Sequence, residues 1–265
     1  MPPRLSPNTV LQERDPREKA RLARAFHADV GAGLAVAPSR PPFAEPGRPD
    51  KPDLVSARDL PRRRLGSVEG RAALLHAIAH IELNAIDLAV DMIVRFSQSP
   101  EIAGDRDAFV QDWSSVCDDE ARHFVMVADR LDELGHSYGS FPAHGGLWDA
   151  ARRTSGDIAA RLAIAPLVLE ARGLDVTPAM IEKLDQAGDM ASADILRVIY
   201  RDEVGHVAIG LRWFTHVANA RGRLAESYFA ELVETHHPGA VRPPFNRPAR
   251  EKAGLPVSFY AQIGQ

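Results

Sequence analysis

A glutamate followed three residues later by a histidine occurs twice in apolar helical surroundings, in Asp119–His123 (DEARH) and in Asp202–His206 (DEVGH). Residues three apart lie on one face of an α-helix, so each copy places a carboxylate beside an imidazole. Both copies lie within a stripe of apolar residues that repeats at helical spacing. Because such stripes face the core, the sequence predicts two helices that carry buried Glu–His pairs.

Two further glutamates lie in apolar stripes of their own, each on a stretch that precedes one copy of the motif. Glu82 stands between Ile78 and Ile86 at helical spacing, and Glu170 shares a face with Leu167. An isolated ionised carboxylate in apolar surroundings is very costly, so each of these glutamates needs a partner.

The apolar stripes and the helix-breaking residues set the limits of the expected elements. We expect core helices over residues 67–96, between residues 104 and 135, over 148–172 and over 192–220, an N-terminal helix over 7–31, and short helices over 179–187 and 224–234. Proline-rich segments over 38–61 and from 238 onward flank them. The expected division is an N-terminal part (1–66), a helical core (67–220) and a C-terminal part (221–265).

A buried ion-pair network of four glutamates and two histidines is the purely structural interpretation. No lysine or arginine shares those apolar stripes, so such a network would leave four carboxylates unbalanced. Two divalent or trivalent metal ions would balance them. Oxygen-rich ligation with two imidazoles suits iron or manganese better than a structural zinc site. The sequence therefore predicts a dinuclear metal site.

The same Glu–His spacing also occurs at Glu133/His136 and at Glu234/His237. Glu133 is rotated to nearly the opposite helix face from Glu120, at about 3.6 residues per turn. The other pair runs directly into a proline and a glycine at a helix end. We interpret both as surface pairs rather than as metal ligands.

The ligand pattern resembles that of the ferritin-like di-iron carboxylate superfamily over about residues 67–220. A closer resemblance is to the bacterial domain-of-unknown-function family 455 within that superfamily. This resemblance is carried by Pro46–Pro49 (PGRP), Leu60–Arg63 (LPRR), Ala77–Glu82 (AIAHIE) and Pro244–Arg247 (PFNR). It implies an all-α, ferritin-like four-helix bundle with one long crossover, which we expect near residues 142–146. It names no substrate.

The resemblance also implies a role for each ligand. Glu120 and Glu203 are expected to bridge the metals, Glu82 and Glu170 to be terminal ligands, and His123 and His206 to bind one metal each. Iron is the expected metal, with manganese or a mixed manganese–iron pair as alternatives.

In related sites an aspartate beside a bridging glutamate accepts the free N–H of the histidine on the partner helix. This assigns Asp202 to His123 and Asp119 to His206. Simple solvation at the surface is the alternative for both aspartates. Tyr200, one turn before the second motif, is expected to be either a catalytic phenol near the metals or a packing residue.

Composition limits the protein class. The 265 residues are 45% hydrophobic and 26% charged, with a formal net charge of −4, which gives no overall attraction to nucleic acid or anionic membranes. The first residues lack the apolar run of a signal peptide, and no stretch is long and uncharged enough to span a bilayer. We expect a cytoplasmic protein without membrane contact.

The first functional hypothesis is a di-iron oxidoreductase, a hydroxylase or monooxygenase that activates dioxygen with Glu120 and Glu203 at the catalytic centre. Its expected partners are a small-molecule or nucleoside substrate and an external electron donor, in a monomer or homodimer. The alternatives are a ferroxidase or other iron-handling protein without an organic substrate, and a purely structural metal pair.

The flanks favour the first hypothesis, because long proline-rich segments are costly to order unless they pack on something. Apolar residues such as Phe43, Phe245 and Tyr260 offer anchors for packing. We expect the flanks to wrap the bundle and to help close a pocket between the first and fourth core helices, near His80 and Tyr200.

Overall fold

The computed structural model describes residues 5–33, 45–60, 64–261 and 263. Within these ranges all regular secondary structure is helical, apart from one isolated bridge between Leu54 and Ala143. The all-α prediction is confirmed for the described part of the chain. The expected anchor Phe43 and the arginines Arg62 and Arg63 lie outside it.

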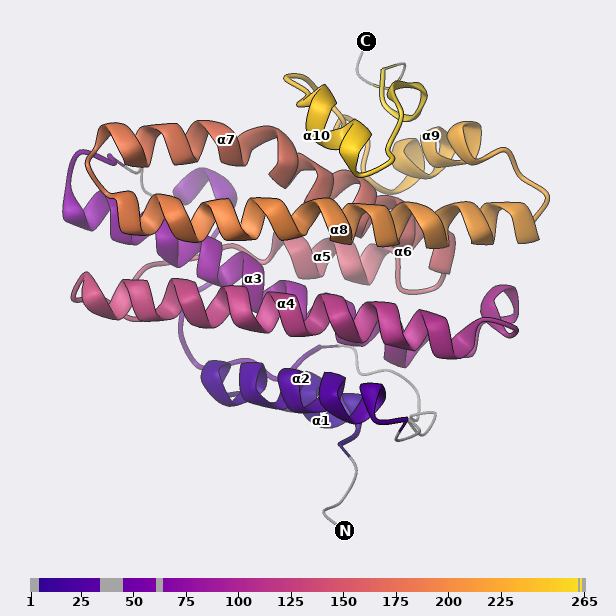
Figure 1. Cartoon of the computed structure of the whole chain (residues 1–265), viewed down its shortest axis with the longest axis horizontal. Helices are drawn as coiled ribbons and strands as arrows, with labels where there is room; N and C mark the ends of the chain where they lie inside the picture. Colours follow the sequence, from indigo (N-terminus) through magenta and orange to yellow (C-terminus); the bar gives the residue numbers. More distant parts are fainter. Residues whose placement is uncertain (1–4, 34–44, 61–63, 262, 264–265) are drawn as a thin grey trace.

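The long helices form the centre of the molecule (Figure 1). They are α3 (Val68–Phe96), α4 (Arg106–Glu133), α7 (Ala171–Gln186) and α8 (Met190–Ala220). Helix α3 packs against α4, α4 against α8, and α7 against α8. Helix α3 begins where the sequence predicts, because Ser67 Oγ accepts the backbone N–H of Gly70 at 3.1 Å. None of the described helices is both long and apolar enough to cross a membrane.

The helix expected over residues 148–172 is wrong in its limits. The chain instead forms α5 (Gly146–Arg153), α6 (Ile158–Ile164) and a π-helical turn, η3 (Ala165–Glu170), that leads directly into α7. The break falls before α6, where the Asp157 carboxylate accepts the N–H of Ala159 at 2.9 Å and caps the new helix. The connection from α4 to α6 passes through α5 and crosses the length of the molecule (Figure 1).

The break predicted at Gly173 and Pro178 is also wrong, because α7 continues through both residues. Pro178 has no N–H to donate to the carbonyl of Leu174, one turn earlier. Asn246 Nδ2, from the C-terminal segment, donates to that carbonyl at 3.0 Å. The helix therefore passes the proline without an unsatisfied acceptor.

Helix α8 approaches the π-helical turn very closely at Gly210. A Cβ atom on Gly210 would lie 2.3 Å from Cβ of Pro166, so a larger residue would force the two segments apart. The π-helical turn ends at Glu170. This close approach lets α8 pack directly on the turn that presents Glu170.

The N-terminal residues pack on the helical core and do not form the single isolated helix that the sequence predicts. Helices α1 (Pro7–Gln12) and α2 (Pro16–Gly31) are separated at Asp15, whose carboxylate caps α2 by accepting from Glu18 N at 2.8 Å. Helix α2 packs along α4. Lys19 of α2 reaches Asp87 of α3, with Nζ 2.5 Å from Oδ1, and both side chains are buried.

The C-terminal residues form α9 (Ala225–His236) and α10 (Arg247–Lys252), of which only α9 is predicted from the sequence. Arg250 anchors this part, with Nη2 2.7 Å from Asp175 Oδ2 on α7 and its guanidinium over the ring of Tyr260. Both flanks thus pack on the core. Single 3-10 turns cover Ala57–Asp59, Pro100–Ile102 and Val257–Phe259.

Candidate metal centre

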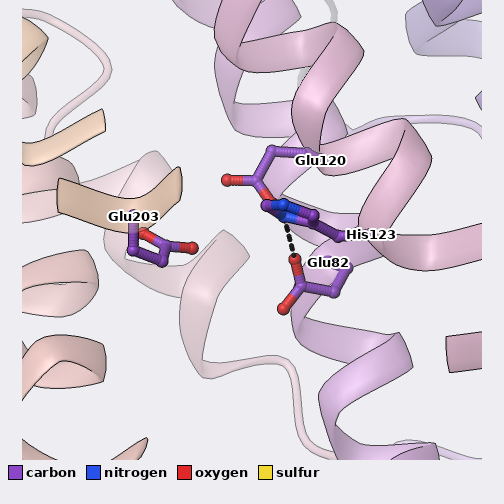
Figure 2. A group of neighbouring side chains, drawn as sticks. All are labelled: Glu82, Glu120, His123 and Glu203. Atoms are coloured by element: carbon purple, nitrogen blue, oxygen red, sulfur yellow. Dashed lines mark hydrogen bonds and ion pairs between the residues drawn. The ribbon is translucent and has the colours of Figure 1, made fainter. Parts of the chain in front are cut away.

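Three core helices bring four predicted ligands to one point inside the molecule. Glu82 comes from α3, Glu120 and His123 from α4, and Glu203 from α8. Each offers a ligand atom, and these atoms all lie within 4.8 Å of one another. Figure 2 shows Glu82 and His123 facing each other, with Glu203 reaching toward them from the opposite helix.

The other two predicted ligands lie at the same cluster. His206 Nδ1 is 3.1 Å from Glu120 Oε1 and 3.6 Å from Glu203 Oε2. Glu170 stands at the end of the π-helical turn. The nearby negative charge of Glu203 raises the pKa of Glu170, so the two carboxylates lie close together. Glu120 also contacts His123, with Oε2 3.4 Å from Nδ1, so this one carboxylate lies between both histidines.

Both histidines use their two ring nitrogens in the same way. Nδ1 faces the glutamates, while Nε2 faces an aspartate of the opposite helix: Asp202 Oδ2 at 3.2 Å from His123 and Asp119 Oδ2 at 3.3 Å from His206. These are the two contacts expected from the sequence, and neither aspartate points only to solvent. The crossed pairs fix the orientation of both imidazoles.

Five buried atoms of the cluster have no well-aligned hydrogen-bond partner among the described residues. They are Oε2 of Glu82, Oε1 of Glu120, Oε2 of Glu170, Oε2 of Glu203 and Nδ1 of His206. Buried polar atoms are normally satisfied, so a group of unsatisfied ones needs an explanation. His206 Nδ1 and Glu120 Oε1 lie 3.1 Å apart, but the five atoms as a group are left without a full set of aligned partners, as expected of side chains that could hold metal ions.

The charges of the cluster are strongly coupled. Burial, followed by the nearby charge of Glu120, raises the pKa of Glu82 and of Glu203. Burial and the charge of Glu203 raise the pKa of Glu170. Burial opposes ionisation of His123, but its contacts with Glu120 and Glu82 outweigh this and raise its pKa to about 10. In the absence of metal cations, protons held by these glutamates and by His123 therefore balance the negative charge of the cluster.

This proton balance predicts how metal loading changes stability with pH. A group whose pKa is raised by folding stabilises the protein below its unfolded pKa and loses that contribution as the pH rises through its folded pKa. For His123 this window runs from 6.5 to about 10. Across it, the melting temperature of metal-free protein should fall faster than that of metal-loaded protein, because metals replace the protons. A melting-temperature difference that stays flat or shrinks as the pH rises would contradict this interpretation.

Arg122 also lies at the cluster, although the sequence patterns do not predict it there. Its Nη2 lies 2.6 Å from Asp119 Oδ1 and 2.8 Å from Asp202 Oδ2, so one guanidinium joins the aspartates that hold the two histidines. One difference between the two motif copies could have indicated this arginine. The first copy has Arg122 directly before its histidine, whereas the second has Gly205 at that position. One arginine therefore serves both halves of the cluster.

Replacing Arg122 with leucine should weaken metal binding about 10–100-fold, because both aspartates lose the donor that orients them. Iron retention against a competing chelator measures this effect. Arg201→Leu is the matched control, because the ion pair of Arg201 with a described residue is to Asp202 alone, at 3.0 Å, and its side chain is 67% exposed. Equal losses in the two variants would show that the bridge across both aspartates is unimportant.

Tyr200 does not have the catalytic position considered for it. Its Oη accepts a hydrogen bond from Asn246 Nδ2 at 2.9 Å, so the phenol holds the C-terminal segment. His80 also faces away from the cluster, with Nδ1 2.8 Å from Tyr138 Oη and Nε2 3.2 Å from Asn84 Nδ2. Both side chains have structural contacts elsewhere.

An apolar cavity of about 220 Å³ reaches the cluster. Its walls come from α3, α4, α5, the π-helical turn, α7 and α8, and Glu82, Glu120, Glu170 and Glu203 all line it. The remaining walls are mainly aliphatic. The cavity does lie against α3 and α8, the expected first and fourth core helices, but neither His80 nor Tyr200 lines it, and the π-helical turn and α7 supply much of its wall.

The fold and the cluster define an all-helical protein with a buried carboxylate–histidine site able to hold metal. The family described as "Protein of unknown function (DUF455)" matches residues 12–261, and the chain belongs to this family. It is also similar to a Haemophilus influenzae protein named "Uncharacterized protein", with 41% identity over 254 residues that cover 93% of this chain and 88% of the relative. No solved structure matches the chain.

Proposed function

We propose that the protein is a dinuclear metal oxidoreductase that activates dioxygen and oxidises a small organic substrate. Its four core helical segments would form a ferritin-like bundle, with iron as the metal pair. The observation that carries the proposal is the apolar cavity bounded by four glutamates of the cluster. A site for metal alone needs no such space beside its ligands, whereas a substrate oxidation does.

The six ligands have the composition for this chemistry. Four carboxylates and two imidazoles suit iron or manganese; Glu120 contacts both histidines, and Glu203 lies 3.6 Å from His206. Two iron ions held there would supply the redox and Lewis-acid chemistry that dioxygen activation requires. Nε2 of each histidine is left to donate to its aspartate, which keeps Nδ1 turned toward the glutamates.

The cavity walls favour a small, mainly apolar substrate over a nucleoside. Outside the glutamates, the polar side chains that line the cavity within the described residues are Arg172 and Thr177. Aliphatic walls of this kind exclude water from the reacting groups and provide few hydrogen bonds for a base. An external electron donor remains part of the proposal, because a catalytic cycle needs electrons to return the metals to the reduced state.

Oxygen uptake by anaerobically loaded ferrous protein tests this proposal against the ferroxidase alternative. We expect a limited uptake on mixing with dioxygen that becomes continuous only when an external reductant is supplied. A ferroxidase would instead sustain uptake with excess ferrous iron alone and would assemble into a hollow, mineral-filled shell. The absence of any uptake by fully loaded protein would contradict both and would leave a structural metal pair.

A further inference from the structure

We propose that the cavity binds an aliphatic chain with an anionic end group, with the chain beside the glutamates and the anion at Arg172 and Arg242. The claim that this molecule is the substrate rests on the proposed oxidoreductase function. The claim that the cavity binds it does not depend on that function. A carboxylate and a phosphate share the required chemistry.

A second hollow adjoins the apolar cavity. It measures about 260 Å³ and shares two wall residues with the cavity, Leu169 and Arg172. Its other described lining residues include His237 and Arg242 from the C-terminal segment, and none of them is an aspartate or a glutamate. An apolar chamber with acidic groups in its wall therefore lies next to a basic chamber, with Leu169 and Arg172 between the two.

Arg172 stands at the junction of the two hollows with part of its guanidinium free. Its Nη1 donates to the carbonyl oxygens of Arg242 at 3.2 Å and Pro244 at 3.0 Å. Every hydrogen bond and ion pair that Arg172 makes to a described residue uses this nitrogen, which leaves Nε and Nη2 available. An arginine fixed on one side presents its remaining donors to an anion in a defined orientation.

The nearby carboxylate does not replace that anion. Asp175 Oδ2 lies 3.5 Å from Nη1 of Arg172, but the same oxygen is 2.7 Å from Nη2 of the buried Arg250. Asp175 Oδ1 accepts from Asn246 N at 2.8 Å. Both oxygens of Asp175 are therefore engaged in holding the C-terminal segment.

Gly173 keeps the apolar chamber open. It lies inside helix α7 and lines the cavity, and a Cβ atom placed on it would meet nothing within 4 Å. Glycine inside a helix is less favourable than alanine, and no close contact or positive φ requires it here. Space for a bound chain explains this glycine. A chamber of about 220 Å³ holds on the order of ten non-hydrogen atoms, judged from about 30 Å³ per molecule in liquid water.

Anaerobic calorimetry on iron-loaded protein tests the inference with four probes of equal chain length: octanoate, octyl phosphate, octan-1-ol and octylamine. We expect octanoate, octyl phosphate or both to bind at least about tenfold more tightly than octan-1-ol, as a charged hydrogen bond warrants. Octylamine should not bind measurably. The two anions distinguish a carboxylate from a phosphate end group.

Three variants locate the binding. Arg172→Gln and Arg242→Gln should each weaken binding of the anions about tenfold and leave octan-1-ol unchanged. Gly173→Leu should abolish binding of all chains by filling the chamber. Arg21→Gln, an exposed arginine on α2 paired with Glu18, is the control for loss of one positive charge. Iron content and melting temperature check that each variant is folded and loaded.

Equal affinity for octanoate, octyl phosphate and octan-1-ol, or anion binding unaffected by Arg242→Gln, would overturn the inference. Arg242 lies outside the core helices. Anion binding to the Arg242→Gln variant can therefore be measured even if the Gly173→Leu variant does not fold. Binding of an anion without its oxidation when dioxygen is admitted would support the binding inference and count against the proposed function. Dioxygen uptake by protein that binds neither anion would support the proposed function and contradict the binding inference.

Discussion

Protein carrying Glu120→Gln is expected to lose nearly all of its bound iron. Glu120 lies between His123 and His206, at 3.4 and 3.1 Å from their Nδ1 atoms, and no other carboxylate of the cluster contacts both. Glutamine keeps the shape but removes the negative charge and points an N–H₂ donor at the same space. Metal analysis after anaerobic loading and desalting measures the loss.

Glu133→Gln is the matched control for this variant. Glu133 lies on the same helix and has the same spacing to a histidine, His136. Its side chain is 64% exposed and pairs with Arg130. It should retain the iron of the unmodified protein. Equal retention by Glu120→Gln and Glu133→Gln would show that the buried motif has no special role in metal binding.

The second large effect is expected at the N-terminal helix. Lys19→Met should lower the free energy of unfolding by about 3–5 kcal/mol, because it leaves the buried carboxylate of Asp87 without its cation. Nζ of Lys19 lies 2.5 Å from Asp87 Oδ1, and the two side chains are 2% and 3% exposed. Urea unfolding of metal-free protein measures this change without a contribution from bound metal.

Two further variants show whether the loss comes from the unpaired charge. The double variant Lys19→Met/Asp87→Leu should regain most of the stability, because it removes both charges together. Arg17→Met, on the same helix, breaks an exposed pair with Asp129 and should cost less than about 1 kcal/mol. A small loss for Lys19→Met would mean that α2 is only loosely held, contrary to its buried contacts with the core.

The candidate ligands were predictable because charged residues stand where apolar ones belong. Glu82 and Glu170 interrupt apolar stripes, and a carboxylate in such a position signals a partner whatever the surrounding fold. The crossed aspartate contacts follow instead from the resemblance to related sites, in which an aspartate beside a bridging glutamate accepts from the histidine of the partner helix. Arg122 was missed because it serves the opposite helix as well as its own, which single-helix spacing does not reveal.

The misplaced helix limits have tertiary causes. Pro178 is typical of a helix break in any local pattern, whereas Asn246, far along the chain, donates to the carbonyl that the proline cannot reach. The same segment also holds Tyr200, because the phenol oxygen of Tyr200 accepts a hydrogen bond from Asn246, and Tyr200 does not line the cavity at the glutamates. The π-helical turn before Glu170 has no simple sequence signature beyond Pro166. These features depend on the C-terminal segment or on contact with α8, which local periodicity does not report.

We propose that the six side chains of the cluster form one site for two metal ions. Anaerobic titration of metal-free protein with ferrous iron, followed by removal of unbound metal and quantitative analysis, tests it most directly. We predict saturation at two iron ions per chain, because the carboxylates of Glu82, Glu120, Glu170 and Glu203 and the imidazoles of His123 and His206 leave five buried atoms without aligned partners. Saturation at one ion per chain, or binding no greater than trace, would contradict the claim.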